Sequence, residues 1–216
     1  MPIVFIVSFE PVGAGLAASL AHPGGNATGM TGAGPETSAK RLQMLRELAP
    51  AARRVGVIWN AAFPGLRGVR KAVSDAAPGL RMTIVDGGVQ DPDGFPRVFE
   101  TMARERIDAL IVLGDNLTYL HRGKIVEAAA RKRWPTIYTT REFCDDSGLA
   151  CYGVNLLAHY KRSAVFIDKI LRGASPAAIP IEQPTTYKLV INLRTANALG
   201  VTIPQSMRLL ADQLIE

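Results

Sequence analysis

The chain has 216 residues, of which 48% are hydrophobic and 20% are charged. This composition is typical of a globular protein near the length at which one core divides into two, and it excludes a disordered chain; no run approaches the ~18 apolar residues of a membrane span. The net charge is +6, but the basic residues are scattered apart from Arg53-Arg54 and a cluster at 131–133 that suits a solvated helix end, so we expect no nucleic-acid partner.

The first predicted element is a strand at residues 3–7, Ile-Val-Phe-Ile-Val. It follows Met1-Pro2 directly, without a basic region or a small-residue cleavage site, so we interpret it as a strand and not as a signal peptide. Small residues at 12–21 predict a helix that Pro23-Gly24-Gly25 closes. Residues 26–31 predict an extended crossing into a second sheet.

Apolar strands and amphipathic helices then alternate, which is typical of a parallel sheet covered by helices. The predicted strands are 55–59, 82–85, 107–113 and 136–138, and the predicted helices are 37–49, 66–77, 94–106 and about 119–132. Four strands with helices between them indicate a doubly wound α/β lobe.

The passage from residues 137–143 to residues 149–154 is predicted to end one sheet and to start another. Beyond it the sequence indicates an extended linker at 176–184, a strand at 188–192 and a short helix at 195–199. A long helix is predicted at 156–171, with one face lined by Leu157, Tyr160, Ala164, Ile167 and Leu171.

These C-terminal elements are too few for an independent α/β domain. We therefore expect the strand at 188–192 to join the strand at 3–7. The predicted division is a first lobe of residues 1–28 and 152–216, and a second lobe of residues 29–151.

The two cysteines, Cys144 and Cys151, lie seven residues apart. No histidine or further cysteine gives them metal-ligand spacing, so the sequence predicts no metal site. We expect buried thiols, with a disulfide as the alternative if the protein is exported.

Polar and aromatic side chains follow the predicted strands, at the edge where an open parallel sheet binds ligands. Carboxylates suit an ammonium group, hydroxyls suit a carboxylate and aromatic rings cover an apolar body, so the set indicates a site for an amino acid or a similar small polar molecule. Taken alone, each residue is more simply explained as a helix cap. The candidate ligand-binding residues are Ser8, Glu10, Trp59, Asn60, Asp115, Asn116, Thr139, Thr140 and Tyr152.

Catalytic signatures are sparse. None of His22, His121 and His159 lies in a metal-protease or phosphate-loop motif, and there is no Gly-x-Ser-x-Gly elbow, so we expect neither an enzyme nor a cofactor. One alternative is a nucleotide- or dinucleotide-binding α/β protein, because residues 13–18 match the G-x-G-x-x-G/A fingerprint. Pro11 lengthens this turn and no strand ends in an acidic residue about 20 positions on, which favours helix packing through small residues.

Short motifs, each different from the others, are distributed along almost the whole chain. They are residues 2–5, 10–16, 23–29 (Pro-Gly-Gly-Asn-Ala-Thr-Gly), 40–50, 55–60 (Val-Gly-Val-Ile-Trp-Asn), 135–143, 152–153, 168–173 and 189–204. Their order and spacing resemble the substrate-binding components of ABC transporters, in the group that includes tryptophan and tyrosine binders. The resemblance implies the type I periplasmic-binding fold: two lobes that close by hinge motion over a solute in an interlobe cleft, dock on a membrane permease and work in the periplasm.

Members of this family begin with an export signal and a further βαβαβ portion of the first lobe. The resemblance therefore predicts two doubly wound parallel-sheet lobes with the first lobe incomplete, and an open strand edge with an apolar face that a homo-oligomer would cover. Glu10 stands where the family usually has Asp. Trp59-Asn60 is not followed by the Glu-x-Asn-Ser run of the aromatic amino-acid binders, which leaves the identity of the ligand open.

Overall fold

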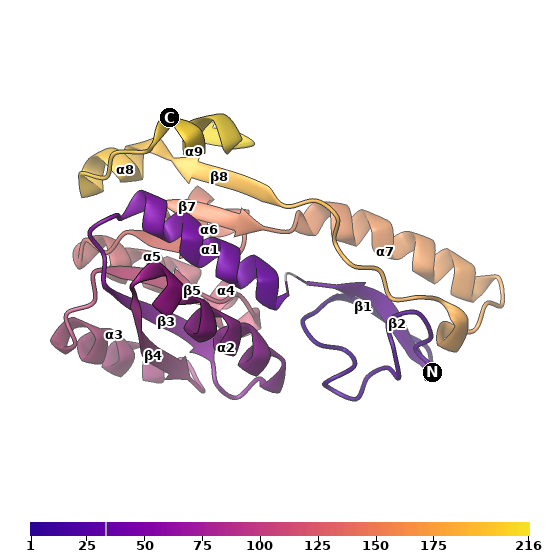
Figure 1. Ribbon diagram of the computed structural model, residues 1–216. Coiled ribbons are helices and arrows are strands. Elements are labelled where there is room, and N and C mark those ends of the chain that lie inside the picture. The colour runs from indigo at the N-terminus through magenta and orange to yellow at the C-terminus, as the bar shows by residue number, and fades with distance from the viewer. Residues whose placement is uncertain (33) are drawn as a thin grey trace. The chain divides into compact units, whose positions relative to one another are not determined.

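The structure is a computed structural model that describes residues 1–32 and 34–216. It divides the chain into two compact units: residues 1–34 with 154–187, called unit 1 here, and residues 35–153 with 188–216, called unit 2 (Figure 1). The chain therefore passes from one unit to the other three times, near residues 34, 153 and 187.

Unit 2 contains a seven-stranded sheet in the order β4-β3-β5-β6-β7-β8-β9. Strands β3 to β7 pair in parallel, β8 is antiparallel to β7, and β9 is parallel to β8. Its strands are β3 (Arg54–Asn60), β4 (Thr83–Val89), β5 (Ala109–Val112), β6 (Thr136–Tyr138), β7 (Ala150–Gly153), β8 (Lys188–Asn192) and β9 (Gln213–Ile215). Its helices are α1 (Pro35–Leu48), α2 (Arg67–Ala76), α3 (Gly94–Arg104), α4 (Asn116–Leu120), α5 (Arg122–Arg131), α6 (Arg141–Asp145), α8 (Leu193–Leu199) and α9 (Gln205–Leu210), with short 3-10 turns at Pro64–Leu66 and Pro78–Leu80.

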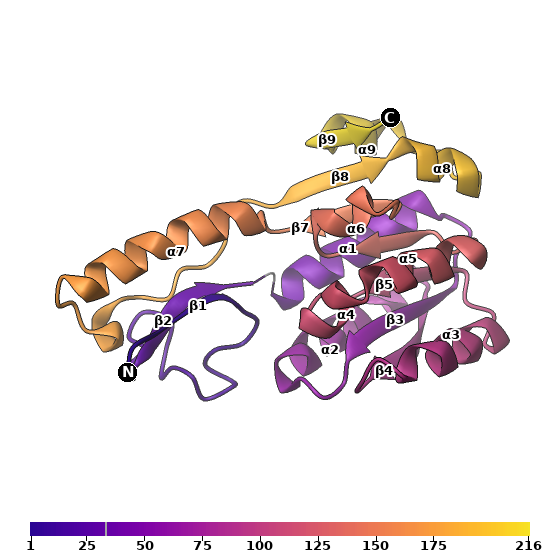
Figure 2. The ribbon, with the colours of Figure 1, turned by 180° about the vertical axis from the view of Figure 1, so that it is seen from behind.

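Helices cover both faces of this sheet. Figure 2 shows α3 and α5 on one face, whereas α1 and α2 lie on the other. Strand β5 is buried along its whole length, and the core on the α3–α5 side joins Phe95 and Met102 to Ile125, Leu110 and Tyr138. Continuous apolar strands are what a parallel sheet covered on both faces requires. The predicted doubly wound α/β fold with a mostly parallel sheet is confirmed.

Two predictions about strand pairing are wrong. The passage 137–154 does not change sheets, because β6 and β7 are parallel neighbours with Ile137 opposite Ala150. The strand at 188–192 exists, but it pairs with β7 in unit 2 and not with residues 3–7, so residues 188–216 do not belong to the first lobe. The physical reason is that β7 is the last of the parallel strands and would otherwise leave an edge of unpaired backbone groups. Strand β8 is largely apolar and pairs with that edge, so the backbone hydrogen bonds of β7 are satisfied.

Unit 1 is built on two parallel strands, β1 (Ile3–Ser8) and β2 (Ala27–Thr31), with the helix α7 (Leu156–Leu171) packed on them. A short 3-10 turn (Pro176–Ala178) leads to Glu182, whose backbone bonds to the edge of β2 through Gly29 and Thr31. Gly29 has φ +144°, and a Cβ there would lie 1.9 Å from the carbonyl oxygen of Phe5. Only glycine lets the two strands approach this closely.

Two elements predicted in unit 1 are also wrong. Residues 12–21 form turns and not a helix, because Gly15 adopts φ +72° and interrupts any helical run. Residues 26–31 are not a crossing between sheets, since they supply β2. The long helix at 156–171 is confirmed.

An ion pair ties α7 to the segment that flanks β2. Arg162 Nε donates to Glu182 Oε2 at 2.9 Å and Nη2 donates to Oε1 at 2.6 Å. The Arg162 side chain lowers the pKa of Glu182 below its ordinary value. A carboxyl group whose pKa is lower in the folded state stabilises the fold above its unfolded pKa, and this contribution is lost as the pH falls through the folded pKa.

We therefore expect Glu182→Gln to lower the free energy of unfolding near neutral pH by less than about 1 kcal/mol, because both side chains are partly exposed. The difference from the original chain should disappear as the pH falls to about 3. Urea unfolding followed by circular dichroism at several pH values measures this. Glu47→Gln, at an exposed position on α1, is the control and should leave the pH dependence unchanged; a difference between Glu182→Gln and the original chain that does not change with pH would contradict the assignment.

Candidate functional site

The carboxyl ends of β3, β5 and β6 lie side by side in unit 2, because these strands are parallel neighbours. Six of the predicted site residues lie at these strand ends: Trp59 and Asn60 are the last two residues of β3, and Asp115, Asn116, Thr139 and Thr140 come shortly after β5 and β6. Tyr152 lies in the adjacent strand β7. The edge of the sheet that the sequence selected therefore carries seven of the nine predicted residues.

Asn60 and Asp115 are in direct contact across the ends of β3 and β5. Asn60 Nδ2 donates to Asp115 Oδ2 at 2.5 Å. The other carboxylate oxygen of Asp115 accepts the backbone N–H of Thr118 at 3.0 Å and closes a capping box at the start of α4. Asp115 is thus a helix cap, which fixes a half-buried carboxylate at this edge.

Trp59 contacts the middle of the neighbouring strand β4. Its Nε1 donates to Asp86 Oδ1 at 3.0 Å, and Arg70 Nε donates to the same oxygen at 2.8 Å. The indole is therefore held at the β4 side of the edge, half-buried, with its polar atom already paired. Its ring remains the part available for an apolar contact.

Thr139 occupies the tightest position of the site. Its side chain is 8% exposed, and its Oγ1 has no hydrogen-bond partner among the described residues. A Cβ at Gly114 would lie 2.0 Å from this Oγ1, and a Cβ at Gly153 would lie 1.7 Å from the Thr139 carbonyl oxygen. Two glycines therefore make room for this one threonine.

The residues that follow Thr139 carry further unsatisfied atoms. Thr140 Oγ1 and Glu142 Oε2 are also buried without a partner in the described part of the chain. Thr140 is the N-cap of α6, but its side chain makes no capping bond. A buried polar atom without a partner costs free energy unless a water molecule or ligand supplies one. Three such atoms within residues 139–142 mark this segment as the polar centre of the site.

The remaining predicted residues of unit 2 contribute less directly. Asn116 is exposed at the first turn of α4. Tyr152 is half-buried, and its backbone carbonyl accepts a bond from Arg41 Nε at 2.6 Å.

Arg41 was not predicted to lie near the site. It is fully buried in α1, where Nη1 also donates to Ser38 Oγ at 2.9 Å. A Cβ at Gly153 would lie 3.6 Å from its Nη2, so the guanidinium lies beside the glycine that faces Thr139. The sequence carried a signal for this, since Arg41 lies four and seven residues before Leu45 and Leu48 on the apolar face of the helix.

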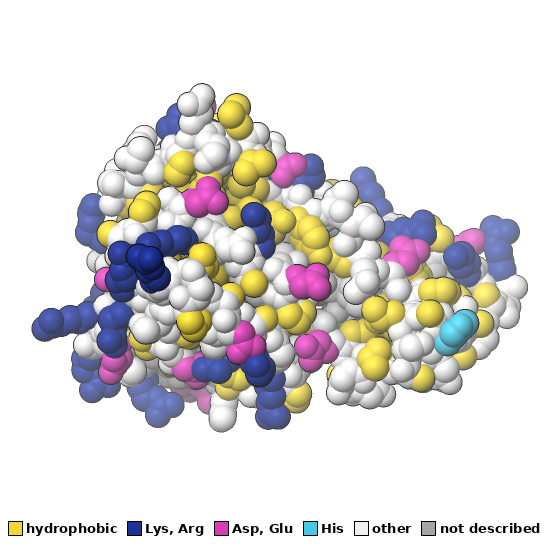
Figure 3. Space-filling view, in the orientation of Figure 1, with side chains coloured by type: hydrophobic (Ala, Val, Ile, Leu, Met, Phe, Trp, Pro, Cys, Tyr) yellow, Lys and Arg dark blue, Asp and Glu magenta, His cyan; other side chains and the backbone are white. Residues whose placement is uncertain are grey.

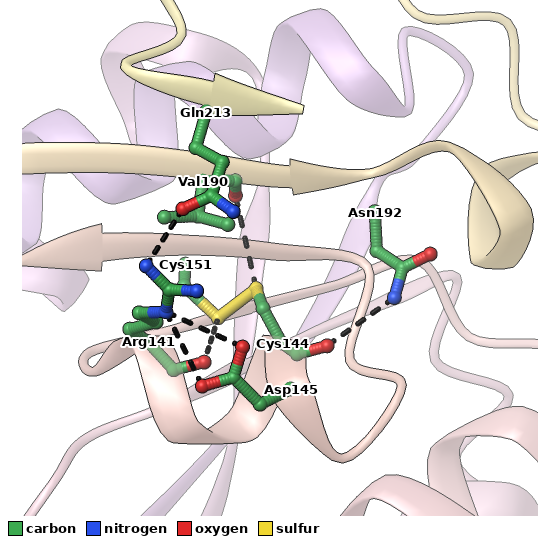
Figure 4. Close-up of polar contacts among 7 residues, drawn as sticks. All are labelled: Arg141, Cys144, Asp145, Cys151, Val190, Asn192 and Gln213. Atoms are coloured by element: carbon green, nitrogen blue, oxygen red, sulfur yellow. Dashed lines mark hydrogen bonds and ion pairs between the residues drawn. A yellow bond between two sulfur atoms is a disulfide. The ribbon is translucent and has the colours of Figure 1, made fainter. Parts of the chain in front are cut away.

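A disulfide between Cys144 and Cys151 joins α6 to β7 directly beyond the Thr139–Thr140 turn (Figure 4). The expectation of free thiols is therefore wrong, and the alternative holds. Arg141 Nη1 donates to Gln213 Oε1 at 2.7 Å and Asn192 Nδ2 donates to the Cys144 carbonyl at 3.2 Å, so α6 is also tied to β9 and β8. These contacts fix the segment that follows the site.

Ser8 and Glu10 lie in unit 1. Ser8 is buried at the end of β1, where its carbonyl accepts the N–H of Gly32 at 2.8 Å. Glu10 is half-buried in the turn that follows, and its carbonyl accepts the N–H of Ala14 at 2.8 Å. This turn does not form the helix N-terminus that a dinucleotide-binding loop needs at residues 13–18.

A groove of about 440 Å³ lies elsewhere in unit 2, before the amino ends of the strands. It is lined by residues 47–52, Asp108, Pro135, residues 200–202 and Pro204, and it contains none of the predicted site residues. Residues 1–32 and 34–216 contain no group of three or more His, Cys, Asp or Glu side chains that could hold a metal ion. Nor does any helix in that part of the chain combine the length and apolar character that spanning a bilayer requires.

Comparison with known proteins places this arrangement in a family. The chain is 27% identical over 202 residues to the tyrosine-binding protein of Clostridioides difficile, which covers 93% of this chain and 57% of that protein. Its fold matches an ABC domain from Streptococcus pneumonia in complex with L-Trp, with TM-score 0.92, 24% identity, and coverage of 99% of this chain and 72% of the other. A ligand-free, open substrate binding protein with adhesive properties from Clostridium difficile matches with TM-score 0.68 and 24% identity, covering 100% of this chain and 71% of the other.

The two solved structures bear out the type I periplasmic-binding-protein-like fold, and the chain spans little more than half of the curated relative. The family model described as "ABC transporter substrate binding protein" matches residues 1–215. This match covers nearly every residue, including the strand ends that carry the site. The chain belongs to the family of ABC transporter substrate binding proteins.

Proposed function

We propose that this chain binds an amino acid, or a similar small polar molecule, at the carboxyl ends of β3, β5 and β6, as the solute-binding component of an ABC transporter. The observation that carries the proposal is the set of three buried polar atoms on Thr139, Thr140 and Glu142 that have no hydrogen-bond partner among the described residues. Such atoms are costly in a folded protein, and a ligand that bonds to them recovers that cost on binding.

The chemistry of the edge suits a zwitterion. The Thr139 and Thr140 hydroxyls donate to a carboxylate, whereas the Glu142 and Asp115 carboxylates accept an ammonium group. Asn60 fixes the position of Asp115 through their hydrogen bond. The rings of Trp59 and Tyr152 supply apolar surface, which favours a ligand with an aromatic or large apolar body.

The names of the similar proteins support an aromatic amino acid as the first ligand to test, since one is a tyrosine-binding protein and another was solved with L-Trp. This chain lacks the Glu-x-Asn-Ser run after Asn60 and has Glu10 where the family usually has Asp. A preference for an amino acid with a different side chain is therefore the alternative result. The proposed role is binding without chemical change of the solute.

The decisive experiment is isothermal titration calorimetry with L-tyrosine and L-tryptophan, with tyramine and tryptamine as matched ligands that lack the carboxylate. Thr139→Val keeps the branched shape and removes the hydroxyl, and we expect it to weaken binding of the amino acids about 10-fold, since one such hydrogen bond contributes about 1.4 kcal/mol. Thr83→Val, at the opposite end of β4 with an exposed side chain, is the control. Equal affinity for tyramine and tyrosine, or an unchanged affinity in Thr139→Val, would contradict the proposed carboxylate site.

The wider assembly follows from family membership and stays a proposal. Ser8 and Glu10 of unit 1 are predicted to complete the site in an interlobe cleft, and an ABC permease is the predicted membrane partner. The location we propose is the periplasm or another compartment outside the cytoplasm, which is where a disulfide such as Cys144–Cys151 persists. A homo-oligomer through unit 1 is the remaining predicted partnership.

A further inference from the structure

The basic residues of unit 2 gather at the amino ends of its strands. Strands β4, β3, β5 and β6 are parallel neighbours that start side by side. Each is reached through a segment that joins two described elements of unit 2, so the surface that these segments form belongs to that unit alone. The segments are residues 46–54, 78–83, 104–108 and 131–135, and their surface is called the entry face here.

The entry face carries the net charge of the whole chain. Its segments hold nine Lys and Arg residues and three Asp and Glu residues, a formal charge of +6 that equals the charge of the full sequence. Eight of the nine basic residues are exposed, and Arg46 is half-buried. Figure 3 shows Lys and Arg side chains gathered at the left of the view, over the end of unit 2 that α3 and α8 mark in Figure 1. Residues that are scattered along the sequence therefore form one basic surface.

Ion pairs remove only part of this charge. Among the described residues, the basic side chains of the entry face form two ion pairs, Arg54 with Glu105 and Arg131 with Glu127. The four side chains are between 44% and 71% exposed, so both pairs are open to solvent and weak. Most of the positive charge is therefore available to a partner.

Three arginines of the entry face adopt a backbone conformation that favours glycine. Arg81, Arg106 and Arg133 have φ of +55°, +51° and +55°, and they are three of the four non-glycine residues with positive φ in the described part of the chain. At the corresponding place after α8 the chain has Gly200. The dipole of the preceding helix favours a cation near this point, but it does not require the one position at which a Cβ is strained. Strain at three equivalent positions indicates a function for these side chains.

The basic side chains are spread over a surface and do not converge on a cavity. Neighbouring strands lie about 4.8 Å apart, so the starts of four strands extend over about 15 Å. The groove at this end of the sheet is lined by Glu47 and Asp108 and by no basic residue, so it does not suit a small anion. Arginine side chains bind phosphate groups well, and an extended array of them fits phosphates that are themselves arrayed on a surface.

We propose that the entry face binds the anionic phospholipid headgroups of a membrane surface. The proposal rests on the proposed function, which places the chain beside a membrane permease. A single-stranded nucleic acid is disfavoured as the partner, because Trp134 is the one aromatic residue of the four segments and it is buried. Strand β3 has seven residues, so about 20 Å of sheet separates the entry face from the carboxyl ends of the strands. Contact with a membrane therefore leaves the proposed solute site uncovered.

Sedimentation with phospholipid vesicles tests this contact. We expect the chain to sediment with vesicles of phosphatidylcholine and phosphatidylglycerol, and to stay in solution with vesicles of phosphatidylcholine alone. Raising the salt concentration from about 0.05 M to about 0.5 M should release the chain, because the shorter Debye length screens exposed charges.

The double variant Arg81→Gly/Arg106→Gly removes two charges from the entry face. Neither side chain forms a hydrogen bond or an ion pair within the described residues, and glycine relieves the strained backbone at both positions. We expect the affinity for anionic vesicles to fall about 30-fold, since each basic side chain near such a surface strengthens binding roughly 5-fold. The temperature of thermal unfolding should not fall, which separates lost binding from lost folding.

Arg67→Gln/Arg97→Gln is the matched control. It removes the same number of charges from two exposed arginines at the other ends of α2 and α3. If the entry face makes the contact, this variant should bind anionic vesicles within about 3-fold of the original chain. An equal loss in the two double variants would show that only the net charge matters and would overturn the proposal.

Two further results would overturn it. One is the absence of binding to anionic vesicles at low salt, and the other is tighter binding to a short DNA duplex than to vesicles at the same phosphate concentration. The solute affinity of Arg81→Gly/Arg106→Gly should equal that of the original chain. A chain that binds anionic vesicles but neither L-tyrosine nor L-tryptophan would contradict the proposed solute and would still support the membrane contact.

Discussion

Gly153→Ala is expected to destabilise unit 2 by roughly 4 kcal/mol or more, which is a large part of the stability of a typical domain. A Cβ at this position would lie 1.7 Å from the carbonyl oxygen of Thr139. The obstacle is backbone and not a flexible side chain, so the end of β7 would have to move away from the turn that follows β6. The Arg41 guanidinium lies on the same side, since its Nη2 would be 3.6 Å from the added Cβ.

The same substitution should also impair binding at the proposed site. Thr139 carries one of the hydroxyls that have no partner in the part of the chain that the structure describes, so a displaced Thr139 loses its position toward the ligand. Urea unfolding measures the first effect and calorimetry with the amino acid measures the second. We expect a fall in affinity of at least about 10-fold in whatever fraction of the variant remains folded.

Gly123→Ala is the matched control for this prediction. Gly123 lies in α5, and a Cβ there meets no atom within 4 Å. Alanine is the better helix former, so this variant should be more stable by about 0.5 to 1 kcal/mol. Opposite signs for the two glycine-to-alanine changes are the expected result, and a fully stable Gly153→Ala protein would show that β6 and β7 are not packed as described.

The local pattern of the sequence was sufficient for most of unit 2. Runs such as residues 55–59 and 107–113 are apolar on both faces and fit buried parallel strands, and the helices between them have clear apolar faces. The local pattern does not show which strands pair when they lie far apart in the sequence. The strand at 188–192 was recognised, but nothing local distinguishes an antiparallel partner in β7 from a parallel partner in β1.

The short helix α6 was not predicted, for a different reason. Helix α6 has five residues, too few to show a periodic pattern, and it is held by the disulfide and by Asn192 and Gln213. For residues 12–21 the error is the reverse, since a helix was predicted where the chain forms turns. Alanines in this segment favour a helix, whereas Gly13 and Gly15 permit turns.

The candidate site shows the same division. The rule that ligands bind at the carboxyl ends of parallel strands selected Asn60, Asp115 and Thr139, and the structure brings the ends of their strands together. The rule does not reveal which atoms are already paired. Asp115 is a helix cap and Trp59 is bonded to Asp86, whereas the hydroxyl of Thr139 is unpaired among the described residues. Only side-chain geometry separates these cases.

Loss of the Cys144–Cys151 disulfide is expected to lower the free energy of unfolding by about 2.5 kcal/mol, from the entropy of closing a loop of this size in the unfolded chain. The two sulfur atoms are buried and lie seven residues apart in the sequence. Either Cys144→Ala or Cys151→Ala removes the whole bond. The single variants and the double variant should therefore lose nearly the same amount, apart from small packing differences.

Urea unfolding with and without a reductant measures this loss directly, since the original chain should respond to the reductant and the double variant should not. Reduction also frees α6 from β7, while Arg141 and Asn192 still hold it through weaker bonds. Because Thr140 is the N-cap of α6, we expect the amino-acid affinity to fall on reduction as well. An unfolding midpoint that ignores the reductant would mean that the bond is absent in solution, and with it the strongest structural support for a location outside the cytoplasm.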